Sequence, residues 1–208
     1  MTVTYKKKEK GHLYRIKFDL CDDVLLDVSV CDDAFIKKGT QISKEELDLL
    51  IEASDYERAK ARALWYLDRG MLTEKGLFDK LIKAKFSKTS SAKVIARLKE
   101  LGLIDDVRYA EIYSQKLMDA NASKRQIYFK LCEKGIRGDL AKETLENLPL
   151  SEETQIKNII EKKYKSKLCD KENIRKVYSA LARKGFSYSG IKSVLKDYED
   201  EINYYNED

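Results

Sequence analysis

The chain has 208 residues, which is enough to bury a core as one long domain or as two short domains. One proline and nine glycines are few for an all-β protein, so the composition favours a mainly α fold. The net charge is +5, and residues 54–106 hold 12 basic and 8 acidic side chains. This local excess fits a nucleic acid or an acidic protein partner, and it fits an ordinary solvated surface equally well.

The sequence argues against membrane, secreted and metal-binding proteins. No apolar run approaches the roughly 18 residues of a membrane span, and the N-terminus lacks the apolar core of a signal peptide. One histidine and four cysteines without CxxC spacing predict no metal site. We therefore expect a cytoplasmic protein with reduced thiols. A disulfide between Cys21 and Cys31, which flank a predicted hairpin, is the less favoured alternative.

Residues 1–53 are expected to form a small β element and a lead-in helix. Apolar and polar residues alternate over residues 14–20 and again over residues 24–30, which predicts a small antiparallel β hairpin. Residues 2–6 could add a third strand. Ser43 and Glu46 have the spacing of a capping box, so a helix is expected to start there.

The rest of the chain repeats itself at a spacing of 50 residues. Thr73, Ser123 and Asn173 coincide at this spacing, and all three are helix N-cap types. Each is followed by apolar residues at helical spacing, then by a bend centred on Lys85, on Gly135 or on Gly185, and then by another helix. The first bend lacks a glycine, which leaves its geometry open.

A further helix precedes each copy, so the pattern predicts three tandem three-helix repeats. The expected preceding helices run over residues 55–69, from Asp106 and from near Ser151. Because one repeat buries its apolar faces poorly alone, we expect an elongated, curved array. Nothing in the sequence requires more than a monomer. The predicted domains are residues 1–53, residues 54–104, residues 105–149 and residues 150–208.

The first repeat joins the second almost without a linker, in the sequence LKELGLIDDVRYA. Gly102 stands where a helix C-terminus needs a left-handed residue, and the leucines on both sides of it are expected in apolar surroundings. Asp105 and Asp106 place carboxylates at the start of the next helix. With no histidine nearby, capping is favoured over acid/base or metal chemistry. The residues assigned to this structural seam are Gly102, Asp105, Asp106, Arg108 and Tyr109.

The repeats and the seam together resemble the RecX family of bacterial regulatory proteins. That family has a GLIDD-like signature followed by an Arg/aromatic/Ala helix start, and residues 102–106 with Arg108, Tyr109 and Ala110 match it in register. The resemblance covers about residues 54–200. It implies a protein that has no enzymatic activity, needs no cofactor and binds the RecA recombinase, mainly as its filament on single-stranded DNA. It also implies inhibition or modulation of the ATPase, strand-exchange and coprotease activities of RecA, in DNA repair and the SOS response.

Lysine and arginine side chains on one face of the array would meet both DNA phosphates and acidic protein surface. Lys75, Arg125 and Arg175 stand two residues past the predicted N-caps, where a cation opposes the helix dipole. Their recurrence indicates a contact, although three matches also arise by chance in a lysine-rich chain. The candidate residues for binding RecA or DNA are Lys75, Lys80, Lys83, Lys85, Lys88, Lys93, Arg97, Arg125, Lys130, Lys134, Arg175, Arg183 and Lys184.

Two other functions stay open at this point. A stand-alone basic helical protein that binds nucleic acid is one, since three-helix units resemble helix-turn-helix folds, and a scaffold that pairs through its hairpin edge is the other. Tyr109, Tyr113, Tyr128 and Tyr178 fall on core positions, which favours packing over base stacking. No phosphate-binding loop or nucleophile motif occurs, so no catalytic residue is expected.

Overall fold

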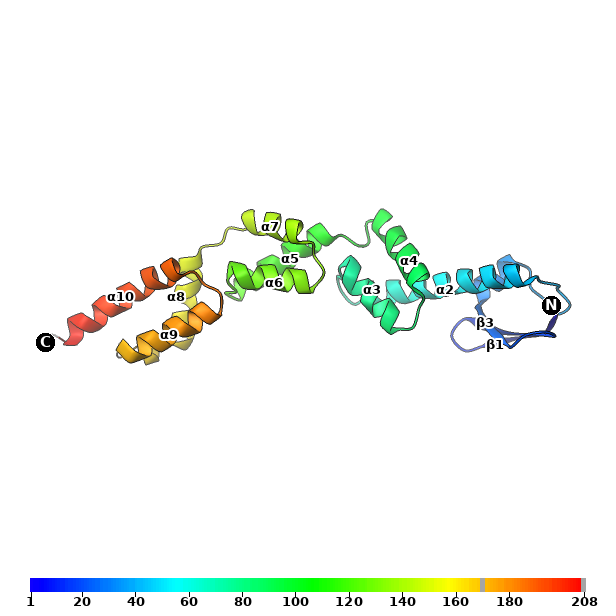
Figure 1. The fold of residues 1–208 in the computed structure, drawn as a ribbon, viewed down its shortest axis with the longest axis horizontal. Helices are drawn as coiled ribbons and strands as arrows, with labels where there is room; N and C mark the ends of the chain where they lie inside the picture. Colours follow the sequence, from blue (N-terminus) through cyan, green and yellow to red (C-terminus); the bar gives the residue numbers. More distant parts are fainter. Residues whose placement is uncertain (169–170, 207–208) are drawn as a thin grey trace. The chain divides into compact units, whose positions relative to one another are not determined.

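The computed structural model describes residues 1–168 and 171–206 and confirms a mainly helical fold with a small antiparallel sheet (Figure 1). Contacts divide the chain into two compact units, Met1–Asp105 and Asp106–Asp208. The division lies next to the predicted boundary between the first and second repeats.

The sheet in the first unit contains the third strand that the sequence left open. Its strands β1 (Val3–Glu9), β2 (Leu13–Phe18) and β3 (Val24–Asp27) pair antiparallel in that order. The sheet packs Ile16 and Leu26, both 0% exposed, against the helices of this unit.

The predicted extension of the last strand to Val30 is wrong. The chain turns at Asp27, whose carboxylate accepts a hydrogen bond from the backbone N–H of Ser29 at 2.9 Å, and helix α1 (Val28–Asp33) begins. Such a bond caps a helix start, and here it outweighs the β propensity of Val28 and Val30. Val28 and Val30 are still buried, so the alternation located core residues while misreading their backbone.

Helix α2 (Lys44–Leu67) is one continuous helix of 24 residues where the sequence predicts two. The capping box is confirmed, since Ser43 Oγ accepts from Glu46 N at 3.1 Å and Glu46 Oε2 accepts from Ser43 N at 2.8 Å. No proline or glycine interrupts these residues, so nothing breaks the helix. The proposed boundary between residues 53 and 54 lies inside α2, which serves both the β element and the first repeat.

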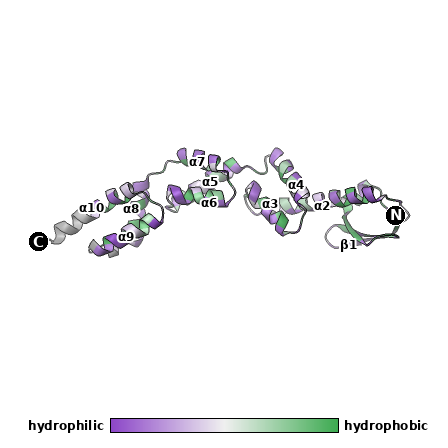
Figure 2. Cartoon of the chain, in the orientation of Figure 1, coloured by the Kyte–Doolittle hydropathy of each residue, from purple (hydrophilic) through white to green (hydrophobic). Residues whose placement is uncertain are grey.

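The three repeats are groups of three amphipathic helices, and Figure 2 shows hydrophobic and hydrophilic residues interleaved along α3 and α6. After α2, the helices are α3 (Glu74–Lys83), α4 (Lys88–Glu100), α5 (Asp106–Asp119), α6 (Lys124–Glu133), α7 (Gly138–Glu146), α8 (Glu152–Lys163), the 3₁₀ helix η1 (Lys165–Lys167), α9 (Lys171–Arg183) and α10 (Tyr188–Asn206). Leu81, Leu131 and Leu181 are equivalent in the three repeats, and each is 0% exposed in its own apolar cluster. Burial of each such side chain contributes about 2–3 kcal/mol.

Two of the three predicted N-caps are confirmed. Thr73 Oγ1 accepts from Gly76 N at 2.9 Å, and Ser123 Oγ accepts from Gln126 N at 3.2 Å. The prediction at Asn173 is wrong, because α9 already begins at Lys171 and Asn173 is its third residue. Lysine and glutamate are better helix formers than asparagine, which favours the earlier start.

All three bends are Schellman motifs, including the one without glycine. Lys85, Gly135 and Gly185 have φ angles of 71°, 92° and 84°. The residue after each bend donates its N–H to the carbonyl of the buried leucine five residues before it, at 3.2, 3.0 and 3.4 Å. Lys85 therefore adopts the left-handed conformation at a steric cost of about 1 kcal/mol. The first bend thus has the same geometry as the two bends that contain glycine.

Candidate partner-binding surface

The thirteen basic candidates lie on helices and bends of both units, and all are exposed except Lys184, which is half-buried. The first unit carries Lys75, Lys80 and Lys83 on α3, Lys85 in the bend, and Lys88, Lys93 and Arg97 on α4. The second unit carries Arg125 and Lys130 on α6, Lys134 at its C-cap, Arg175 and Arg183 on α9, and Lys184 in the bend.

Several of these cations already pair with carboxylates. Lys75 Nζ lies 3.4 Å from Asp79 Oδ2, and Lys93 Nζ lies 2.6 Å from Glu52 Oε1. Arg97 similarly pairs with the glutamate three residues further on, at 3.0 Å. Exposed ion pairs of this kind contribute about 0–1 kcal/mol, so an anionic group of a partner can replace the carboxylate beside the cation at little cost.

Three other candidate cations lie over aromatic rings. Lys80 Nζ is 5.0 Å from the ring centroid of Tyr66, and Arg125 Cζ is 5.7 Å from that of Phe129. Lys134 Nζ lies 6.0 Å from a tyrosine ring of α5. Because Phe129 is 53% exposed, its ring and the Arg125 guanidinium form a flat cationic surface that a partner can reach.

The first-turn cation recurs in two repeats and not in three. Lys75 and Arg125 are the second residues of α3 and α6, as predicted. Arg175 is the fifth residue of α9, because that helix starts earlier than expected. The positional argument for contact therefore applies to Lys75 and Arg125 and is wrong for Arg175.

The structure brings Arg125 and Lys184 together where the second repeat meets the third. Ser123 Oγ donates a hydrogen bond to the carbonyl oxygen of Lys184 at 2.6 Å, across 61 residues of sequence. A Cβ atom at Gly185 would lie 3.1 Å from both Cβ and Cδ of Arg125. Gln155 Nε2 adds a hydrogen bond to the carbonyl oxygen of residue 122 at 2.9 Å. Lys184 therefore helps to hold two repeats together through its backbone.

The seam has the predicted bend but not the predicted burial. Gly102 has φ 67°, and Leu103 N donates to the carbonyl oxygen of Leu98 at 2.9 Å, which again is a Schellman motif. Leu101 and Leu103 are 53% and 51% exposed, so their expected apolar surroundings are wrong. Only Ile104, 3% exposed, turns back into the core from the left-handed bend.

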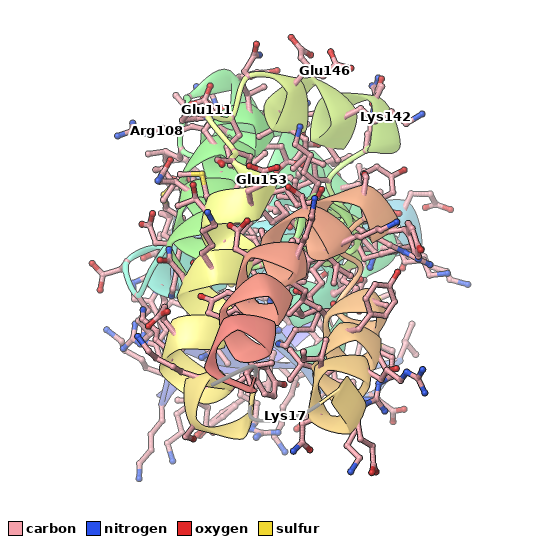
Figure 3. All side chains as sticks on the ribbon, turned by 90° about the vertical axis from the view of Figure 1, so that its left-hand side faces the viewer. Lys17, Arg108, Glu111, Lys142, Glu146 and Glu153 are labelled. Atoms are coloured by element: carbon pink, nitrogen blue, oxygen red, sulfur yellow. The ribbon has the colours of Figure 1, made fainter. Side chains whose placement is uncertain are left out.

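The remaining seam residues form the start of α5. Asp105 precedes the helix and Asp106 is its first residue, so both carboxylates lie at the positive end of the helix dipole. Arg108 is exposed and points outward in Figure 3. Tyr109 is half-buried with its ring 5.6 Å from that of Tyr113, and burial raises the pKa of the Tyr109 hydroxyl. These positions suit a structural joint.

The sequence analysis does not single out one exposed surface of the first unit, which is formed by Arg58, Arg62 and Trp65 on α2 and by Arg69, two residues past the end of this helix. Spacings of four and three residues place Arg58, Arg62 and Trp65 on one side of α2, and Arg69 follows Trp65 by four residues, just beyond the helix. Trp65 is 44% exposed, and the guanidinium Cζ of Arg69 lies 3.4 Å from its ring centroid. The spacing is present in the sequence, but the buried alanines Ala59 and Ala63 give the dominant helical pattern in this segment.

Within residues 1–168 and 171–206, no group of histidine, cysteine or acidic side chains could hold a metal ion. In the same part of the chain, no helix combines the length and apolar character needed to cross a membrane. The disulfide alternative is wrong, because Cys21 and Cys31 are free thiols. Cys31 is buried, which raises the pKa of its thiol to about 11, and Cys169 lies outside the described residues.

Comparison with protein families finds two matching models. Residues 59–98 match the model described as RecX, first three-helix domain, and residues 151–195 match RecX, third three-helix domain. Among curated proteins, the regulatory protein RecX of Clostridium tetani is 32% identical over 201 residues, which cover 93% of this chain and 92% of the relative.

Solved structures agree at the level of fold. A crystal structure of regulatory protein RecX superposes with a TM-score of 0.68 at 24% identity, over 94% of this chain and 98% of that chain. The crystal structure of RecX from Lactobacillus salivarius gives a TM-score of 0.63 at 26% identity, over 71% of this chain and 98% of that chain.

Proposed function

The chain belongs to the RecX family, and from this membership we propose that it regulates the RecA recombinase by binding its filament on single-stranded DNA. Binding inhibits or modulates the ATPase, strand-exchange and coprotease activities of RecA, and through them recombination, DNA repair and the SOS response. The observation that carries the proposal is the similarity to a curated regulatory protein RecX along 93% of the chain.

The exposed cations of the three repeats support an electrostatic contact with the filament. A filament on single-stranded DNA offers phosphates, and each phosphate that Lys or Arg neutralises releases counterions and makes binding salt-dependent. We assign the first contacts to Lys75 and Arg125, which are exposed at helix starts that a cation does not stabilise. Lys184 acts as a positioning residue, because its carbonyl oxygen binds Ser123.

In this proposal the protein catalyses no reaction and needs no cofactor. It is a cytoplasmic monomer that changes the activity of RecA by occupying the filament. Its helical repeats provide the side chains that bind, and the seam at Gly102–Asp106 provides a joint between repeats and no direct contact.

The deciding experiment measures ATP hydrolysis by RecA on single-stranded DNA while this protein is titrated in. We expect inhibition at or below equal amounts of the two proteins. Unchanged hydrolysis would reject the proposal. If the protein then still binds DNA without RecA, the alternative of a stand-alone nucleic-acid-binding protein replaces it.

The contact residues Lys75 and Arg125 are tested by changing both to Gln, together with the further candidate Arg175. The matched control changes three exposed lysines outside the candidate set, Lys38, Lys142 and Lys192, so that both variants lose the same charge. We expect weaker filament binding and a shallower salt dependence for the first variant only. Equal weakening of both variants would show that net charge, and not these positions, determines binding.

A further inference from the structure

The proposed function does not use the exposed surface formed by Arg58, Arg62 and Trp65 of α2 and by Arg69, which follows the helix. Trp65 is the only tryptophan of the chain, and it exposes 44% of its surface. Exposed scattered leucines are ordinary on protein surfaces, but a half-exposed indole with two arginines on the same helix face and a third just beyond the helix end is a recognisable binding arrangement. We call these four residues the Trp65 face.

The Trp65 face borders a groove of about 540 Å³ within the first unit. Arg58, Arg62 and Trp65 form one wall, and the turn between β1 and β2 at Gly11 and His12 forms the other. Phe86, over which Arg58 Cζ lies at 5.9 Å, also lines the groove. The groove therefore combines aromatic rings with guanidinium groups, and elements far apart in sequence build it.

The groove favours anions. Among the described residues that line it, Asp27 is the one acid, and its side chain is 10% exposed. Asp27 Oδ1 already accepts hydrogen bonds from Ser29 N at 2.9 Å and Ser29 Oγ at 2.7 Å. Its charge is thus committed to the start of α1, and Arg58 and Arg62 remain exposed beside it.

The indole ring offers a stacking platform. Arg69 Cζ lies 3.4 Å from the ring centroid and Arg62 Cζ lies 5.3 Å from it. A planar guanidinium on an indole occupies the space that a nucleobase would take, and every base has a π-face that can replace it. The Arg69 guanidinium donates a hydrogen bond to the carbonyl oxygen of Trp65 at 2.7 Å and lies 4.0 Å from Asp68 Oδ2, both on the surface. When a base displaces it, the guanidinium exchanges these partners for the phosphate of the same strand.

We propose that the Trp65 face and its groove bind single-stranded nucleic acid directly, with a base on Trp65 and the backbone phosphates on Arg58, Arg62 and Arg69. Duplex DNA does not fit this arrangement, because its bases are stacked on one another and their faces are closed. An acidic peptide would use the arginines and leave the indole without a role. This inference goes beyond the proposed function, because the site acts without RecA.

The single tryptophan permits a direct test in the full-length protein. Its fluorescence is followed during titration with oligothymidylate about ten nucleotides long, and in parallel with an abasic deoxyribose-phosphate strand of the same length and charge. We expect saturable quenching by the thymidylate strand and little quenching by the abasic strand. Absence of quenching, or equal quenching by the abasic strand or by polyglutamate, would overturn the proposal.

Variants provide the second test, with binding measured by the anisotropy of a labelled strand. Trp65→Ala is expected to weaken binding by about tenfold or more, and Trp65→Phe by less, because a phenyl ring still stacks. Phe35→Ala is the matched control, since Phe35 is 84% exposed in the same unit and lies outside the groove. An equal loss in both alanine variants, with unchanged helix content, would contradict a specific site.

This test and the RecA assay fail independently. Trp65→Ala with lost strand binding and retained inhibition of RecA leaves both inferences standing as separate functions. Quenching without any effect on RecA would reject the proposed function and retain the Trp65 site. Inhibition of RecA without quenching would retain the proposed function and reject the Trp65 site.

Discussion

Repeats one and three begin their third helix in the same way. In repeat one, Asp55 Oδ2 on the first helix accepts a hydrogen bond from the backbone N–H of Ser87, the N-cap of α4, at 3.0 Å. In repeat three, Glu152 Oε1 does the same for Ser187, immediately before α10, at 2.6 Å. The serine and the carboxylate thus tie the third helix of each repeat to its first.

The two repeats differ at the bend two residues before that serine. Lys85 is exposed there, whereas Gly185 lies against the second repeat, with Ser123 Oγ and the Arg125 side chain 3.1 Å from where a Cβ would be. The backbone turns equally in both, so the left-handed conformation alone does not require glycine. Glycine is required where a neighbouring repeat packs against the bend.

Among variants that test this difference between the bends, Gly185→Val is expected to reduce the free energy of unfolding most. A β-branched side chain there meets both an unfavourable positive φ and the Ser123–Arg125 contact, so we expect a loss of about 2–3 kcal/mol in the free energy of unfolding. Gly39→Val is the control, because Gly39 has φ 91° and open space within 4 Å of a Cβ. Equal losses in urea denaturation would mean that the inter-repeat contact is unimportant.

Ser123→Ala comes next. It removes the N-cap bond to Gln126 and the bond to the Lys184 carbonyl, so we expect a loss of about 1–2 kcal/mol. The control is Ser87→Ala, which removes the N-cap bond to Ser90 of α4 and is expected to cost about 1 kcal/mol. If Ser87→Ala costs as much or more in thermal unfolding, the bond between repeats contributes nothing.

Lys85→Gly is expected to stabilise the fold slightly. Glycine relieves the left-handed strain but adds freedom to the unfolded chain, so the net gain should be about 0.5 kcal/mol. A small rise in the melting temperature would show it. A destabilised variant would mean that the Lys85 side chain makes a contribution that its exposure does not reveal.

The smallest effect concerns repeat two, where Arg137 occupies the position of the two serines without a side-chain cap bond. The Arg137 guanidinium lowers the pKa of Asp139 to about 2, and the N–H of Leu140 assists. A carboxyl with a folded-state pKa below its usual value of 3.8 stabilises the fold above that value, and the contribution is lost as the pH falls towards 2.

Asp139→Asn should therefore flatten the dependence of unfolding on pH between about 4 and 2, by a small amount because the pair is exposed. Urea denaturation of both proteins across this range provides the measurement. Identical acid dependence would exclude Asp139 as its source.

Local signals predicted most of the fold. Ser43, Thr73 and Ser123 were found as caps, and the spacing of 50 residues located the buried leucines of each repeat, because a cap or a helix face depends on residues a few positions apart. The failures at Val30 and Asn173 also occurred at element ends, where competing local preferences differ little in energy.

The sequence by itself therefore determined most of the helices, the two bends that contain glycine and the repeat, since each rests on short-range backbone bonding and apolar periodicity. Only the tertiary structure decided that Gly185 packs on Arg125, and that Trp65 and Arg62 face the turn at His12 across a groove. These contacts join residues separated by about 50 positions or more along the chain. No local spacing encodes such proximity, which depends on how whole helices pack.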